Sequence, residues 1–126
     1  MHPFLLVFLG GGLGAALRHG VHLFALRGPG AQFPYGTLCI NVLGSCLMGM
    51  VVAWFAVRGE LAPSARLFLT TGVLGGFTTF SAFSLDAFLL YERGQPGLAA
   101  VYVLGSVVLS IGGLFAGLAL MRALLA

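Results

Sequence analysis

Long runs without a charged side chain constrain this sequence more than any other feature. No Asp, Glu, Lys or Arg occurs at positions 28–57, 67–85 or 94–121. Each run supplies the roughly 20 apolar residues that a helix needs to cross a hydrocarbon core of about 30 Å. Only 7% of all residues are charged and 60% are hydrophobic. A soluble domain of this size needs a more polar surface, so the chain is predicted to be an integral membrane protein.

The segment 3–26 is a further candidate span, because only Arg18 interrupts its apolar residues. We predict an all-α integral membrane protein with a single domain over residues 1–126. Its transmembrane helices are expected at about 3–26, 33–57, 64–91 and 97–124. No basic stretch precedes the first apolar run, so a cleaved signal peptide is not expected.

The arginines give no preference for one orientation in the membrane. All 6 basic residues are arginines, and the four-span layout divides them evenly. One side holds Arg58, Arg66 and Arg122, and the other holds Arg18, Arg27 and Arg93. Orientation normally follows an excess of Lys and Arg on the cytoplasmic side. Wrong loop assignments or a host factor would explain the balance, and so would insertion in both orientations followed by pairing into an antiparallel dimer.

Asn41 lies within the charge-free run 28–57, where an unpaired amide is costly. Transfer of such a group from water to cyclohexane costs roughly 4–8 kcal/mol. One interpretation is an interhelical hydrogen bond that stabilises packing, and the other is a donor that lines a pore. Taken alone, the residue favours the hydrogen bond.

The predicted fourth helix carries Tyr102, Ser106 and Ser110 at spacing i, i+4, i+8, which places them on one face. A single serine is uninformative, because its hydroxyl can bond back to its own helix. A polar stripe among Val, Leu, Ile and Gly side chains indicates a hydrated path.

The segment GGFTTFSAFS, residues 75–84, breaks the pattern of a plain membrane anchor. Phenylalanines and hydroxyl side chains each recur every three residues, at Phe77, Phe80 and Phe83 and at Thr78, Ser81 and Ser84. In a continuous helix, these sets form two neighbouring slanted tracks. Gly75–Gly76 weaken the helix just upstream, and irregular backbone at membrane depth occurs where protein or water satisfies it. Aromatic packing with a kink is one interpretation, but the combination favours a path for an ion or small solute.

The same segment favours an anion over a cation. No Arg or Lys lies at its centre, so a site built on a basic side chain is absent. Phenylalanine edges carry partial positive charge, and hydroxyls and amides donate hydrogen bonds. This lining suits a small anion that has shed part of its water.

Three stretches resemble the Fluc (CrcB) family of fluoride channels. GTLCINVLGS, residues 36–45, is similar to the family pattern GTL-x-x-N-x-x-G. TGVLGGFTTFSAFSLD, residues 71–86, is similar to TG-x-x-GG-x-[TS]-TFS-x-FS-x-[ED]. GGGLGAALR, residues 10–18, matches the family's glycine-rich first helix that ends in arginine. The likeness extends over essentially the whole chain.

The resemblance implies a fluoride-selective channel that exports fluoride passively through the cell (inner) membrane, as a multi-pass protein. It also implies a dual-topology homodimer with two antiparallel pores, a broken third helix and a structural Na⁺ at the dimer axis. The expected partners are fluoride, a second copy of the chain and the lipid bilayer.

By the same resemblance, Phe80 and Phe83 are the pore phenylalanines and Arg18 is a vestibule arginine. The other expected pore positions are Asn41, Tyr102, Ser106, Ser110, Thr79 and Ser81. Backbone carbonyls of Gly75 and Thr78, two from each subunit, would hold the Na⁺. The chain departs from the family pattern at Phe77, Ala82 and Asp86, where an aliphatic residue, Thr or Ser, and Glu are more usual.

Two other functions stay open. A small proton-coupled exporter of the multidrug type shares the size and the four spans, but it needs an acid in its first helix, and this chain has none there. A non-conducting membrane assembly subunit would have a dry, packed third helix. An enzyme is not expected, because the few histidines and acids form no nucleophile–base–acid set.

Overall fold

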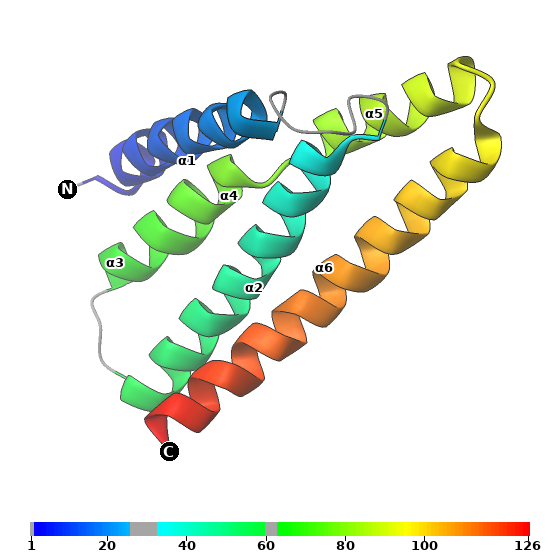
Figure 1. Ribbon diagram of the computed structural model, residues 1–126. Helices are drawn as coiled ribbons and strands as arrows, with labels where there is room; N and C mark the ends of the chain where they lie inside the picture. Colours follow the sequence, from blue (N-terminus) through cyan, green and yellow to red (C-terminus); the bar gives the residue numbers. More distant parts are fainter. Residues whose placement is uncertain (1, 26–32, 60–62) are drawn as a thin grey trace.

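The computed structural model describes residues 2–25, 33–59 and 63–126, which are almost entirely helical (Figure 1). The elements are α1 (Pro3–Ala25), α2 (Tyr35–Arg58), α3 (Pro63–Leu67), the π-helix η1 (Phe68–Leu74), α4 (Gly75–Phe77), α5 (Ser81–Glu92) and α6 (Pro96–Leu125). The predicted helix ends lie within two residues of these bounds. Residues 26 and 27, which include the predicted loop arginine Arg27, lie outside the described ranges.

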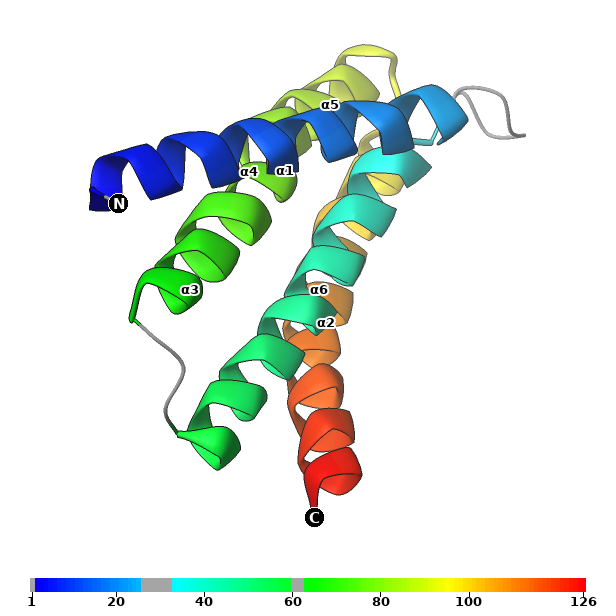
Figure 2. The ribbon, with the colours of Figure 1, turned by 90° about the vertical axis from the view of Figure 1, so that its left-hand side faces the viewer.

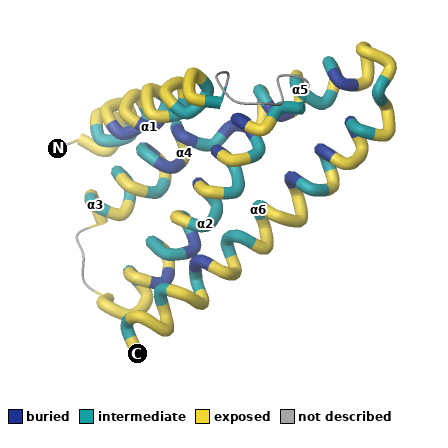
Figure 3. The backbone as a smooth tube through the Cα atoms, viewed as in Figure 1, coloured by how far each residue is buried: buried dark blue, intermediate teal, exposed yellow. Residues whose placement is uncertain are grey.

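Within the described residues, four stretches are long and apolar enough to cross a membrane. They are Pro3–Ala25, Tyr35–Arg58, Pro63–Glu92 and Pro96–Leu125. Exposed residues cover the outer faces of α1 and α6, and buried residues lie where helices meet (Figure 3). Exposed rings and branched chains such as Phe4, Leu104 and Phe115 suit contact with lipid. The chain is an all-α, multi-pass membrane protein, as the sequence predicts.

Helices α2 and α6 lie side by side and form the longest interface of the fold (Figures 1 and 2). Glycines allow their backbones to meet. A Cβ at Gly49 would clash with the carbonyl oxygen of Leu114, and one at Gly117 would clash with that of Cys46. Small residues of this kind permit close approach in lipid, where apolar burial between helices gives little driving force.

Helix α1 packs against the first half of the third span, over η1 and α4 (Figure 2). A Cβ at Gly10 would lie 2.9 Å from both the Cα of Gly72 and the carbonyl oxygen of Phe68. A Cβ at Gly14 would clash with the carbonyl oxygen of Val73. The glycine-rich first helix is therefore a packing surface for η1, and the wide π-helical turns of η1 lie directly before the break in the span.

The third span breaks at Thr78 and not at the glycine pair. Gly75 has helical dihedral angles, φ −63° and ψ −38°, whereas Thr78 is extended, with φ −78° and ψ 160°. The glycine pair that is expected to weaken the helix is itself helical, and the chain leaves the helix at Thr78. Gly76 serves packing instead, since a Cβ there would clash with the carbonyl oxygen of Gly11. The helix resumes as α5 at Ser81.

Substitution of Gly117 by alanine is expected to destabilise the protein by about 1–3 kcal/mol, because the new methyl group meets the Cys46 backbone, which cannot yield as a side chain would. Thermal unfolding of the purified protein in detergent measures this change. Gly112→Ala, on the same helix with nothing within 4 Å of the new Cβ, is the matched control. Equal unfolding temperatures for the two variants would contradict the assigned packing.

Candidate functional site

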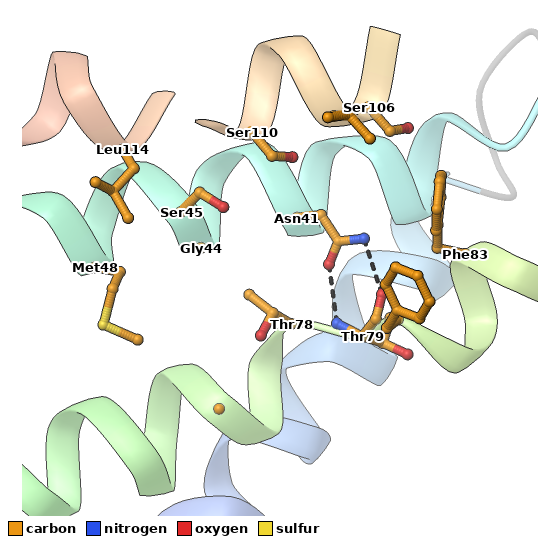
Figure 4. A pocket seen from close by; sticks show the side chains of 13 residues that line it. Asn41, Gly44, Ser45, Met48, Thr78, Thr79, Phe83, Ser106, Ser110 and Leu114 are labelled. Atoms are coloured by element: carbon orange, nitrogen blue, oxygen red, sulfur yellow. Dashed lines mark hydrogen bonds between the residues drawn. The ribbon is translucent and has the colours of Figure 1, made fainter. Parts of the chain in front are cut away.

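A groove of about 430 Å³ lies where the broken third span faces α2 and α6 (Figure 4). Helix α2 contributes Asn41, Gly44, Ser45 and Met48, and the third span contributes Gly75, Thr78, Thr79, Phe80 and Phe83. Helix α6 contributes Ser106, Val107, Ser110 and Leu114. The lining holds aromatic, hydroxyl and amide side chains and no charged one.

Asn41 pairs with the backbone at the break (Figure 4). Its Nδ2 donates to the carbonyl oxygen of Thr79 at 2.9 Å, and its Oδ1 accepts from the Thr79 N–H at 2.9 Å. The amide thus replaces two hydrogen bonds that a continuous helix would supply. The interpretation of Asn41 as a residue that stabilises packing by a hydrogen bond is confirmed, and Asn41 also lines the groove. One Nδ2 hydrogen is left over from the pair.

Two backbone carbonyls lose their helical donors at the break. In an α-helix, the N–H of each residue donates to the carbonyl four residues earlier. The Thr79 N–H donates to Asn41 instead of the Gly75 carbonyl. The Ala82 N–H donates to Thr79 Oγ1 at 3.1 Å instead of the Thr78 carbonyl. Gly75 and Thr78 are the residues expected to hold Na⁺ from the sequence, and both line the groove.

The hydroxyls of the third span are mostly engaged by the chain itself. Thr78 Oγ1 donates to the Leu74 carbonyl at 3.0 Å, and Ser84 Oγ donates to the Phe80 carbonyl at 2.9 Å. Ser81 is exposed and lies outside the groove lining, with its Oγ 3.4 Å from Thr79 Oγ1. The continuous hydroxyl track predicted from three-residue spacing is therefore wrong, because the helix is interrupted between its members.

Helix α6 carries a buried serine hydroxyl that accepts and donates no hydrogen bond among the described residues. Ser106 is only 5% exposed, and its Oγ has no hydrogen-bond partner among the described residues. Ser110 lies one turn further along the same wall of the groove (Figure 4). A buried hydroxyl without a partner is costly, so a polar ligand in the groove would satisfy it.

The predicted pore phenylalanines lie together at the groove. Their ring centroids are 5.5 Å apart and their planes are tilted by 55°. Phe83 is buried, whereas Phe80 is 77% exposed. Phe77, the third member of the predicted aromatic track, is buried outside the lining, where its ring faces Gly44.

Tyr102 lies beside the groove and does not line it. The side chain is 1% exposed, and its ring contacts that of Phe83 with centroids 5.2 Å apart. The hydroxyl donates to Asp86 Oδ2 at 3.2 Å. This pair could not be predicted from the sequence, because the two residues come from different helices and neither spacing nor a motif links them. Tyr102 therefore packs against the groove wall at Phe83 and holds the Asp86 carboxylate by a hydrogen bond.

Arg18, the predicted vestibule residue, is half-buried on α1 and is absent from the groove lining. The described structure thus brings together Asn41, Thr79, Phe80, Phe83, Ser106 and Ser110, together with Gly75 and Thr78. It leaves Tyr102, Ser81 and Arg18 outside that lining.

An uncharged groove with hydroxyl and amide groups beside an interrupted membrane helix is typical of multi-pass membrane proteins whose broken spans form sites for small ions or solutes. Comparison with known proteins identifies the particular family. Residues 5–118 match the family model described as "CrcB-like protein, Camphor Resistance (CrcB)". The chain belongs to the CrcB family, and the resemblance seen in its motifs is confirmed.

Relatives cover nearly the whole chain. A "Fluoride-specific ion channel FluC 2" from Nitrobacter hamburgensis is 61% identical over 94% of this chain and 96% of its own length. A "Fluoride-specific ion channel FluC" from Rhodopseudomonas palustris (strain BisB5) is 63% identical over 96% of this chain and 98% of its own. Another from Granulibacter bethesdensis is 55% identical over 99% of this chain and 98% of its own.

Replacement of Asn41 by alanine is expected to lower stability by about 1–3 kcal/mol, because it leaves the N–H and carbonyl of Thr79 unpaired in an apolar environment. Unfolding of the purified protein in mixed micelles with increasing SDS measures the loss. Ser110→Ala is the matched control, since Ser110 lines the same groove and makes none of the hydrogen bonds described above. If both variants unfold like the parent protein, Asn41 does not hold the break.

Proposed function

We propose that this chain is a fluoride-selective ion channel that lets fluoride leave the cell passively. One observation carries the proposal: an uncharged groove at the helix break is lined by the rings of Phe80 and Phe83 and by Ser106, whose hydroxyl has no partner among the described residues. The printed names of the relatives, which describe fluoride-specific ion channels, support it.

The lining fits the chemistry of fluoride. The ion is small and strongly hydrated, so water removed in a narrow path must be replaced by other donors. Ser106, Ser110 and the remaining N–H of Asn41 offer hydrogen bonds, and the ring edges of Phe80 and Phe83 offer partial positive charge. The absence of a basic side chain from the lining keeps binding weak enough for release. A larger halide fits such a path poorly.

Passive export follows from acid–base chemistry. Hydrofluoric acid crosses membranes as a neutral molecule and ionises in the less acidic interior. A channel then lets the trapped anion flow outward, aided by a negative-inside potential. The chain needs no energy source for this task, and we propose no enzymatic activity for it.

We further propose that two copies insert in opposite orientations and form an antiparallel homodimer with two pores. Phe80 is 77% exposed in the single chain, and Gly75 and Ser81 beside it are exposed as well. A second copy over this face would enclose the open side of the groove. The balanced arginines of the two membrane sides support dual insertion.

We propose Na⁺ as a structural ion at the dimer axis, held by the Gly75 and Thr78 carbonyls of each subunit. The support is that both carbonyls have lost their helical donors to other partners. Unwound carbonyls at helix breaks are recurrent Na⁺ ligands. The ion would link the two broken spans across the interface.

The alternatives have less support. A proton-coupled exporter needs an acid in the first span, and α1 contains none. Asp86 is the acid closest in sequence to the break, and its carboxylate is bound by Tyr102. A non-conducting assembly subunit does not explain an unpartnered hydroxyl facing a groove.

Phe80→Ile and Phe83→Ile should each slow fluoride efflux roughly tenfold or more, since a lost ring-edge interaction of about 1.4 kcal/mol corresponds to tenfold. Efflux from liposomes that contain the purified protein is followed with a fluoride electrode, with chloride as the comparison ion. Phe88→Ile is the matched control, because this ring is 54% exposed on α5 and lies outside the groove lining. Normal efflux from both pore variants would remove them from the mechanism, and no fluoride efflux from the parent protein would refute the proposed function.

Sodium is expected to slow the exchange of subunits between dimers. At a sodium concentration 100 times the dissociation constant, the bound ion stabilises the dimer by about 2.7 kcal/mol. This corresponds to about 100-fold slower exchange if the ion is lost before the dimer separates. Dimers carrying two different fluorophores are mixed in detergent, and energy transfer reports exchange in sodium or N-methylglucamine buffer. Equal exchange rates in the two buffers would argue against the Na⁺ site. A protein that is monomeric in both buffers would argue against the dimer.

A further inference from the structure

The ring of Tyr102 contacts two phenylalanines. One is Phe83 of the groove, with centroids 5.2 Å apart. The other is Phe33, at 5.5 Å and an interplanar angle of 89°, which is an edge-to-face contact. Phe33 packs against the same buried cluster that contains Phe83 and Tyr102. It does not line the groove.

The backbone fixes the position of Phe33. Pro34 follows it with φ −79° and ψ 66°, the geometry of an inverse γ-turn. The Tyr35 N–H donates to the Phe33 carbonyl at 2.8 Å, as that turn requires. Proline fixes φ near this value, and the ring of Tyr35 packs on that of Phe33 with centroids 4.7 Å apart. Phe33 is thus held in place before α2 begins.

We propose that Phe33 is a positioning residue for fluoride transport that acts through Tyr102. This inference rests on the proposed function. Phe33 keeps the Tyr102 ring against Phe83 and its hydroxyl on Asp86. The role is new to the site, because neither the motifs nor the groove lining includes Phe33.

Two effects follow when the Phe33 ring is removed. Tyr102 gains room where the Phe33 ring was, so Phe83 loses a fixed neighbour beside the groove. The hydrogen bond from Tyr102 to Asp86 also loosens. Asp86 lies one helical turn after Phe83, so a released carboxylate near the path repels an anion. Both effects are expected to slow fluoride transport.

The test combines two measurements on the full-length protein. Fluoride efflux from liposomes is expected to fall roughly three- to tenfold in Phe33→Leu, the range set by one lost aromatic contact. Phe33→Tyr keeps the ring and should restore efflux to within about twofold of the parent protein. Phe24→Leu, which alters a ring that is 80% exposed on α1, is the matched control and should leave efflux unchanged.

The second measurement reports the position of Tyr102 without reference to transport. With 3-fluorotyrosine in place of tyrosine, the ¹⁹F resonance of Tyr102 is compared in H₂O and D₂O. A residue that is 1% exposed should show no solvent isotope shift in the parent protein or in Phe33→Tyr. A shift should appear in Phe33→Leu, as Tyr102 becomes exposed.

The outcomes separate the inference from the proposed function. Parent protein without fluoride efflux refutes the function, whereas the isotope shift still tests the contact between the two rings. Phe33→Leu with slow efflux and no isotope shift shows that Phe33 does not act through Tyr102. An isotope shift with parent-like efflux shows that holding Tyr102 does not serve transport. If Phe33→Leu does not fold, slow efflux from a folded Phe33→Tyr variant overturns the inference.

Discussion

The pairing of Asn41 with the backbone of Thr79 is the interaction on which the rest of the site depends. A membrane-spanning helix cannot open at mid-span unless its freed N–H and carbonyl groups find other partners. The amide of Asn41 supplies one acceptor and one donor at the same point, so Thr78 can adopt an extended conformation. Without this pairing, the third span would either form a continuous helix or leave backbone N–H and carbonyl groups unpaired.

Close backbone contacts position the two sides of that break. Glycines of α1 let this helix pack on η1 and α4, and Gly49 and Gly117 bring α2 and α6 together. Asn41 lies on α2, so the α2–α6 contact also sets the distance between Asn41 and the Ser106 wall of the groove. The same small residues that give no functional signal in the sequence therefore determine the width of the site.

The sequence predicts the spans well and the site only in part. Charge-free runs determine where helices lie, because the cost of burying charge in lipid is independent of tertiary detail. Helix propensity predicts the weak point at Gly75–Gly76, but both residues are helical, Gly76 packs against Gly11, and the break lies at Thr78. The Tyr102–Asp86 bond and the Phe33 contact connect different helices, and a periodicity within one helix cannot reveal them.

Two exchanges of hydrogen-bond partners at the break support the proposal that it serves fluoride and Na⁺ together. Asn41 accepts a hydrogen bond from the Thr79 N–H, and the Thr79 hydroxyl accepts one from the Ala82 N–H. The Gly75 and Thr78 carbonyls are thereby left as acceptors for the proposed cation. The donors offered to an anion come from elsewhere, from Ser106 and Ser110 on α6 and from the second hydrogen of the Asn41 amide. Because acceptors and donors belong to different elements, the proposed Na⁺ would leave free the donors proposed to bind fluoride.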